Sequence, residues 1–102
     1  MKKLLLATVL TLSATTSQAS SSPDFELCEA YSSLAETIMT SRQNGTDMSA
    51  LIKIVLNQSE GTDQAALLLV KAAYKEHRYS TESIQQRTIQ DFKNQAFLAC
   101  YK

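Results

Sequence analysis

The sequence has little of the chemistry that enzymes use. Its 102 residues include one histidine, His77, two cysteines and no tryptophan. Nucleophilic catalysis needs a base beside the nucleophile, and the single histidine stands between Glu76 and Arg78 in a polar segment. The serines are plentiful, but none occupies a recognisable nucleophile turn. We therefore predict no catalytic residue, and a solvated loop position is the simplest interpretation of His77.

Ligands for a metal ion or a cofactor are equally sparse. One histidine and two cysteines that lie 72 positions apart (100 − 28) do not have the spacing of a metal site. Two glycines are too few for a glycine-rich phosphate loop. Asp24, Glu26 and Glu29 stand near a predicted helix start, where acidic side chains favour the positive end of the helix, so we do not interpret them as an acid–base pair. We predict neither metal nor cofactor.

Residues 1–19 have the pattern of an export signal. Two lysines provide the positive start, Leu4–Leu12 is apolar but only about half as long as a membrane-spanning helix, and Ser17-Gln18-Ala19 is a small-x-small cleavage site. We predict cleavage before Ser20, which leaves residues 20–102 as one helical domain. The opening is typical of bacterial signals and favours the periplasm, with full secretion as the alternative.

The charge balance of the predicted mature chain excludes some partners. Removal of the two signal lysines leaves 8 of 10 basic residues against 10 acidic ones, a net charge of 8 − 10 = −2. Binding to nucleic acid or to an anionic membrane surface depends on a basic excess. We therefore expect no nucleic-acid partner and no membrane association after cleavage.

The two cysteines, Cys28 and Cys100, predict a disulfide. Paired cysteines are the usual state in exported proteins, and a metal site or a free nucleophile is the less favoured alternative. In the chain-entropy model a loop of 72 positions (100 − 28) contributes about 4 kcal/mol. Small domains often need such a link because their cores are modest, so this one could decide whether the chain folds.

Apolar spacing predicts an all-α fold, a small four-helix bundle with short connections. Pro23 at a first helical position and Gly45 after a last one agree with this pattern. Ser22, Thr46, Thr62 and either Ser80 or Thr81 are the predicted caps. The third helix is apolar nearly all round and is expected at the buried centre. The predicted helices are 23–43, 47–57, 63–75 and 81–102.

The disulfide also predicts how the first and last helices pair. It joins the start of one to the end of the other, so the two helices should be antiparallel, with neighbouring positions that sum to about 128. The neighbours expected from this register are all apolar: Tyr31 with Phe97, Ala35 with Phe92, and Met39 with Ile89.

Through three short motifs, the chain resembles a group of small exported proteins of Gram-negative bacteria and their prophages. The motifs are Arg42-Gln43-Asn44-Gly45, then Ala73-Tyr74 with Arg78-Tyr79-Ser80-Thr81, and the ending Phe92…Cys100-Tyr101-Lys102. The resemblance covers signal and mature domain alike and implies a helical, disulfide-closed periplasmic protein. The group has no assigned activity, so the resemblance supplies no catalytic or binding residue.

One short segment has the composition of a protein-binding site. Tyr74, His77, Arg78 and Tyr79 combine two aromatic rings with two groups that can carry positive charge, and tyrosine and arginine are enriched among binding hot spots. The alternative is structural: Tyr74 packs in the core, Tyr79 covers the start of the last helix, and His77 and Arg78 are solvated.

Together these patterns favour a non-enzymatic periplasmic protein that binds another envelope protein, as an inhibitor, an immunity protein or a prophage-encoded accessory module. The alternative is a periplasmic chaperone of acid or envelope stress that opens at low pH. Cys28 and Cys100 lie near the two ends of the domain, whereas small chaperones of that kind close an internal loop with their disulfide.

Overall fold

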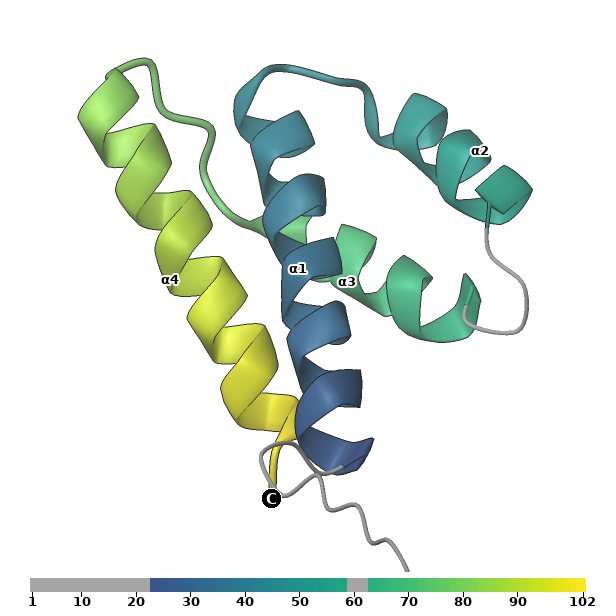
Figure 1. Cartoon of the computed structure of the whole chain (residues 1–102). Helices are drawn as coiled ribbons and strands as arrows, with labels where there is room; N and C mark the ends of the chain where they lie inside the picture. Colours follow the sequence, from purple (N-terminus) through teal and green to yellow (C-terminus); the bar gives the residue numbers. More distant parts are fainter. Residues whose placement is uncertain (1–22, 59–62) are drawn as a thin grey trace, which may run out of the picture.

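The structure, a computed structural model, describes residues 23–58 and 63–102. These residues form an all-α bundle of four helices closed by one disulfide, and they include no strand (Figure 1). The predicted signal peptide and the predicted caps Ser22 and Thr62 lie outside the described residues. The helices are α1 (Pro23–Gln43), α2 (Met48–Gln58), α3 (Asp63–Lys75) and α4 (Glu82–Cys100).

Helix α1, not α3, is the centre of the bundle. It packs against the other three helices, most extensively against α4, which runs alongside it in the opposite direction (Figure 1). Helix α3 buries one face, but Leu68 is 57% exposed and Ala72 is also exposed. The prediction that α3 is the buried centre of the bundle is therefore wrong. These two apolar side chains stay exposed because no further described element of this small domain lies there to cover them.

The core takes side chains from all four helices. Val70, Ala35 and Met39 are fully enclosed, and half-buried Tyr31 and Tyr74 pack against the cluster from outside. Burial of this apolar surface is the main force that holds the helices together. The buried cluster consists of Ala35, Ile38, Met39, Leu51, Val55, Ala66, Leu69, Val70, Ala73, Ile89, Phe92 and Ala96.

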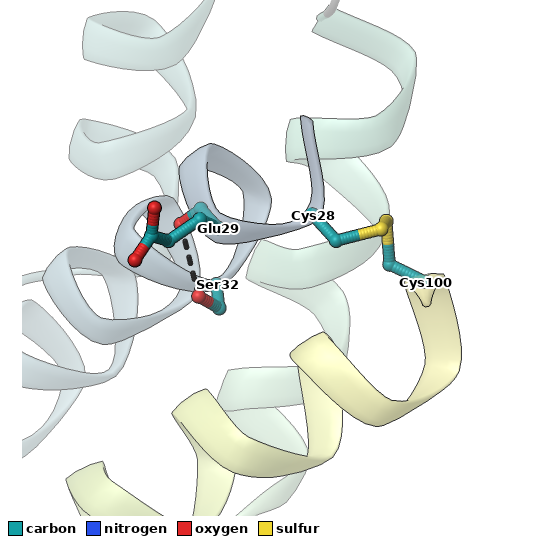
Figure 2. Close-up of a disulfide and its surroundings, with 4 residues drawn as sticks. All are labelled: Cys28, Glu29, Ser32 and Cys100. Atoms are coloured by element: carbon teal, nitrogen blue, oxygen red, sulfur yellow. Dashed lines mark hydrogen bonds between the residues drawn. A yellow bond between two sulfur atoms is a disulfide. The ribbon is translucent and has the colours of Figure 1, made fainter. Parts of the chain in front are cut away.

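The predicted disulfide is present and joins the start of α1 to the end of α4. The Cα atoms of Cys28 and Cys100 lie 5.5 Å apart (Figure 2), which is a typical separation for a bridged pair. One turn further along α1, Ser32 is buried, and its hydroxyl donates a hydrogen bond of 2.9 Å to the Glu29 carbonyl. The bridge fixes the two helices in the predicted antiparallel arrangement.

The ion pair between α1 and α4 agrees with the predicted register. Lys93 Nζ lies 3.2 Å from Glu36 Oε1, and the two positions sum to 129, one away from the expected value. The residues of two predicted pairs, Ala35 with Phe92 and Met39 with Ile89, lie in the one buried cluster. The third pair, Tyr31 with Phe97, stays a prediction.

The end of α1 is a glycine-dependent turn, as the sequence predicts. Gly45 has a φ of 90°, a conformation that side chains with a Cβ disfavour. The Gly45 amide donates to Arg42 O and the Thr46 amide to Ser41 O, at 3.1 and 3.0 Å. This pair of bonds is the Schellman motif, and it turns the chain from α1 towards α2.

Two predicted caps differ in detail. The Leu51 amide donates to the Asp47 carbonyl at 3.0 Å, so Asp47, rather than Thr46, holds the cap position before α2. Thr81 does precede α4, but its side chain makes no capping hydrogen bond. Helix α4 ends at Cys100, two residues earlier than predicted, because the backbone of Tyr101 is extended.

Candidate protein-binding surface

The segment that connects α3 to α4, residues 76–81, lies against the end of α1 and is fastened there by side chains of α1. All four predicted binding residues belong to this segment or adjoin it. The structure thus brings Tyr74, His77, Arg78 and Tyr79 to one corner of the molecule, but the corner gives them different environments.

Gln43 is the residue that positions the segment. Its side chain is 1% exposed. The Oε1 atom accepts a hydrogen bond of 2.9 Å from the Tyr79 amide, and Nε2 donates one of 2.8 Å to the His77 carbonyl. Nε2 also lies 3.5 Å from Met39 Sδ. Because one partner is only a donor and the other only an acceptor, the amide has one orientation. The Gln43 side-chain amide thereby pairs with one carbonyl and one amide of the loop backbone, as a backbone amide group of a neighbouring β-strand would.

Arg42 and Tyr74 fasten the end of α3 to the same corner. The Arg42 guanidinium donates to the Glu76 carbonyl from Nε and Nη2, at 3.2 and 2.9 Å, and it stacks 5.0 Å above the centre of the Tyr74 ring. The Tyr74 hydroxyl donates to the Thr46 carbonyl. Burial raises the pKa of Tyr74 above 10.0, with Arg42 lowering it and Asp47 raising it to smaller extents. Tyr74 is therefore a structural contact of the corner.

Arg78 also turns towards the end of α1, although the side chain is exposed. Its Nε donates to the Gln43 carbonyl at 3.2 Å. Its guanidinium lies against Gly45, so that Nη2 would be only 2.8 Å from a Cβ atom at that position. Gly45 is thus favoured by its backbone conformation, and a Cβ atom there would require the end of the Arg78 side chain to shift.

His77 and Tyr79 are the predicted residues that face outward. The His77 side chain is exposed and the Tyr79 side chain half-buried, and their rings meet edge to face with centroids 4.8 Å apart. With Arg78, Ser80, Thr81 and Gln85 they line an open hollow of about 390 Å³ beside the start of α4. The Gln85 side chain is held at this hollow because its Nε2 donates to the Tyr79 carbonyl.

Sequence reasoning missed Arg42 and Gln43, which hold the surface in place. A signal for Gln43 was present in the sequence. It follows Ala35 and Met39 at intervals of four and continues their buried stripe, and a polar residue on such a stripe must find buried partners. No comparable signal exists for Arg42.

No family model, curated protein or solved structure matches this chain. The surface is therefore interpreted from its own geometry. Within residues 23–58 and 63–102, no group of three or more histidine, cysteine, aspartate or glutamate side chains is arranged to hold a metal ion. None of the described helices combines the length and the apolar character that crossing a membrane requires.

Proposed function

We propose that the protein is a non-enzymatic, exported binding module that holds another envelope protein, in the manner of an inhibitor or immunity protein or of a prophage-encoded accessory protein. The observation that carries this proposal is the corner at residues 76–81. Gln43 fixes the backbone on both sides of residue 78, while the His77 side chain is exposed and the Tyr79 side chain is half-buried beside it. A loop that is already ordered loses less conformational entropy on binding.

The disulfide and the predicted export signal support the periplasm as the compartment in which the protein acts. A bridge between Cys28 and Cys100 is typical of an oxidising compartment, and the export signal predicted for residues 1–19 leads to the periplasm. Binding there at the outward-facing rings requires no basic excess, which agrees with the acidic balance of the predicted mature chain.

Partner capture by variants of the corner tests the proposal. His77→Ala and Tyr79→Leu should abolish capture of a periplasmic partner by cross-linking, and His77→Ala should leave the melting temperature unchanged. Lys53→Ala is the matched control, since Lys53 is exposed on α2. The proposal fails if capture survives both corner variants, or if Lys53→Ala weakens capture as much as they do.

The exposed leucines support a second candidate function, the stress chaperone. Leu27, Leu68 and Leu98 are 65%, 57% and 77% exposed, and accessible apolar side chains of this kind can hold unfolded clients. A chaperone should prevent aggregation of several unrelated unfolded proteins and lose its own tertiary signal in acid. The binding module should protect none of them and stay folded.

A further inference from the structure

A groove runs along α4, on the side that faces α3. Three adjoining hollows of about 320, 210 and 280 Å³ compose it. The first two share Tyr31 and Ala99, and the last two share Phe92 and Gln95. The groove therefore extends from the disulfide to the loop at residues 76–81.

The apolar part of the groove is lined by small side chains and by exposed leucines. Ala65, Ala72 and Ala99 line it together with Leu27 and Leu68. Helices α3 and α4 both pack on α1, and the two make few contacts with each other. Alanine side chains leave room for another backbone to come close, and covering the leucines releases about 25 cal/mol for each Å² of apolar surface removed from water.

The far part of the groove is charged and meets the candidate binding corner. Glu76, Arg87 and Asp91 line it, and Tyr79 lines both this part and the hollow beside His77. Two carboxylates against one guanidinium give this end a formal net charge of −1. The groove is thus apolar at one end and acidic at the other.

We propose that the groove binds an amphipathic helix of a different protein, with an apolar stripe at one end and basic residues at the other. The stretch of α4 from Ile84 to Ala99 covers about 22 Å at the usual rise per residue, which is about four turns. Helices dock in apolar grooves through side chains spaced three and four residues apart. This proposal rests on the proposed function, and it specifies the chemistry of the partner.

The distribution of charge favours a different protein over a second copy of this chain as the occupant. A two-fold axis that pairs the α4 helices antiparallel places the apolar end of each groove against the acidic end of the other. An axis that pairs them parallel places Glu76 and Asp91 against their own copies. A symmetric dimer is thus mismatched at both ends when antiparallel and at the charged end when parallel, whereas a basic helix end complements the acidic one.

Synthetic peptides test the groove without knowledge of the partner. The first is a helix of about four turns with a leucine stripe and arginines at one end. The second carries glutamates in place of the arginines, and the third has the composition of the first in scrambled order. Titration of each into the purified, oxidised protein should give micromolar binding of the first peptide and much weaker binding of the other two.

Two variants and a matched control locate the binding. Leu68→Gln should weaken binding of the first peptide about tenfold or more, a loss of about 1.4 kcal/mol. Leu56→Gln should have no effect, because Leu56 is 50% exposed on α2 and lines none of the three hollows. Asp91→Lys should reverse the preference between the arginine and glutamate peptides.

Several outcomes overturn the proposal. If the scrambled peptide binds equally well, the groove is a surface for unfolded chains. If the protein is a dimer that Leu68→Gln dissociates, the groove is occupied by a second copy of the chain. Absence of binding to any peptide, or equal loss in Leu56→Gln, removes the groove as the site. Capture of a partner that needs His77 but survives Leu68→Gln also overturns the groove proposal, while the proposed function stands.

Discussion

The two ends of the α1–α4 pair are fastened by different chemistry. At one end a covalent bond joins Cys28 to Cys100, and the rings of Phe25, Phe97 and Tyr101 pack around the chain end with centroids 5.4 to 6.0 Å apart. This end resists separation through a constraint on the unfolded chain and through apolar contact.

At the other end the fastening is polar. Gln43 holds the backbone at His77 and Tyr79 through two partly buried hydrogen bonds, and Arg42 holds the Glu76 carbonyl through two exposed ones. Hydrogen bonds contribute modest net stability but dictate geometry, because a buried group that loses its partner is costly. The comparison indicates that the covalent end supplies stability and that the polar end supplies the shape of the candidate binding corner at residues 76–81.

Removal of the disulfide should have the largest effect. Replacing both Cys28 and Cys100 by serine removes the constraint on a loop of 72 positions and should lower the free energy of unfolding by about 4 kcal/mol. Chemical denaturation of the variant and the oxidised protein measures the difference. Helix content should persist if the variant folds. A melting temperature that reduction leaves unchanged contradicts a stabilising role for the bridge.

Replacement of Gln43 should be the next most damaging change. Gln43→Leu fills a similar volume but leaves the His77 carbonyl and the Tyr79 amide without their partner, which should cost about 2 kcal/mol or more. Gln86→Leu, at an exposed position on α4, is the matched control and should shift stability by less than about 0.5 kcal/mol. Similar denaturation midpoints for the two variants would mean that the polar end contributes nothing of its own.

Gly45→Ala tests two contributions to the polar end, the backbone conformation at residue 45 and the contact with Arg78. The backbone conformation at φ 90° should cost a residue with a Cβ about 1–2 kcal/mol. The near contact with the Arg78 guanidinium should add to this. The free energy of unfolding distinguishes the two contributions when Gly45→Ala is made in the wild-type protein and again in the Arg78→Ala protein. The substitution should cost less in the Arg78→Ala protein. An equal cost in both would show that the guanidinium simply moves aside.

The smallest effect should be the pH dependence of Tyr74→Phe. The wild type should be more stable by about 1 kcal/mol at neutral pH, owing to the hydrogen bond to Thr46. The folded pKa of Tyr74 is raised above 10.0, so its contribution is fully present below pH 10.0 and is lost as pH rises through that folded pKa. Thermal melts from pH 8 upward should show the difference narrowing only above pH 10.0. A constant difference would mean that the hydroxyl is not part of the contact.

Local signals in the sequence predicted much of the fold. The bounds of α1 and α3 agree with the predicted ranges 23–43 and 63–75. Pro23 begins the first segment and Gly45 follows its end, whereas an acidic first residue and an apolar run mark the second. The bridge was predictable because two cysteines allow one pairing. The exposure of one face of α3 was not predictable. Apolar composition does not reveal whether another element covers the face that carries Leu68.

The candidate site was predictable as a place but not as an arrangement. Composition pointed to residues 74–79, whereas the contacts that orient them come from Gln43, which lies 34 and 36 positions away from His77 and Tyr79. Such long-range pairing leaves no trace in local spacing. As a result Arg78 was predicted to be solvated or to bind a partner, and its bond to the Gln43 carbonyl was not foreseen.

Amide hydrogen exchange at Tyr79 tests most directly whether Gln43 holds the candidate binding corner in place. In the wild type this amide donates to Gln43 Oε1, so it should exchange much more slowly than in an unfolded peptide. In Gln43→Leu the same amide should exchange fast while amides in the middle of α4 keep their protection. Fast exchange of the Tyr79 amide in the wild type, or equal protection in both proteins, would contradict a corner that is ordered before any partner binds.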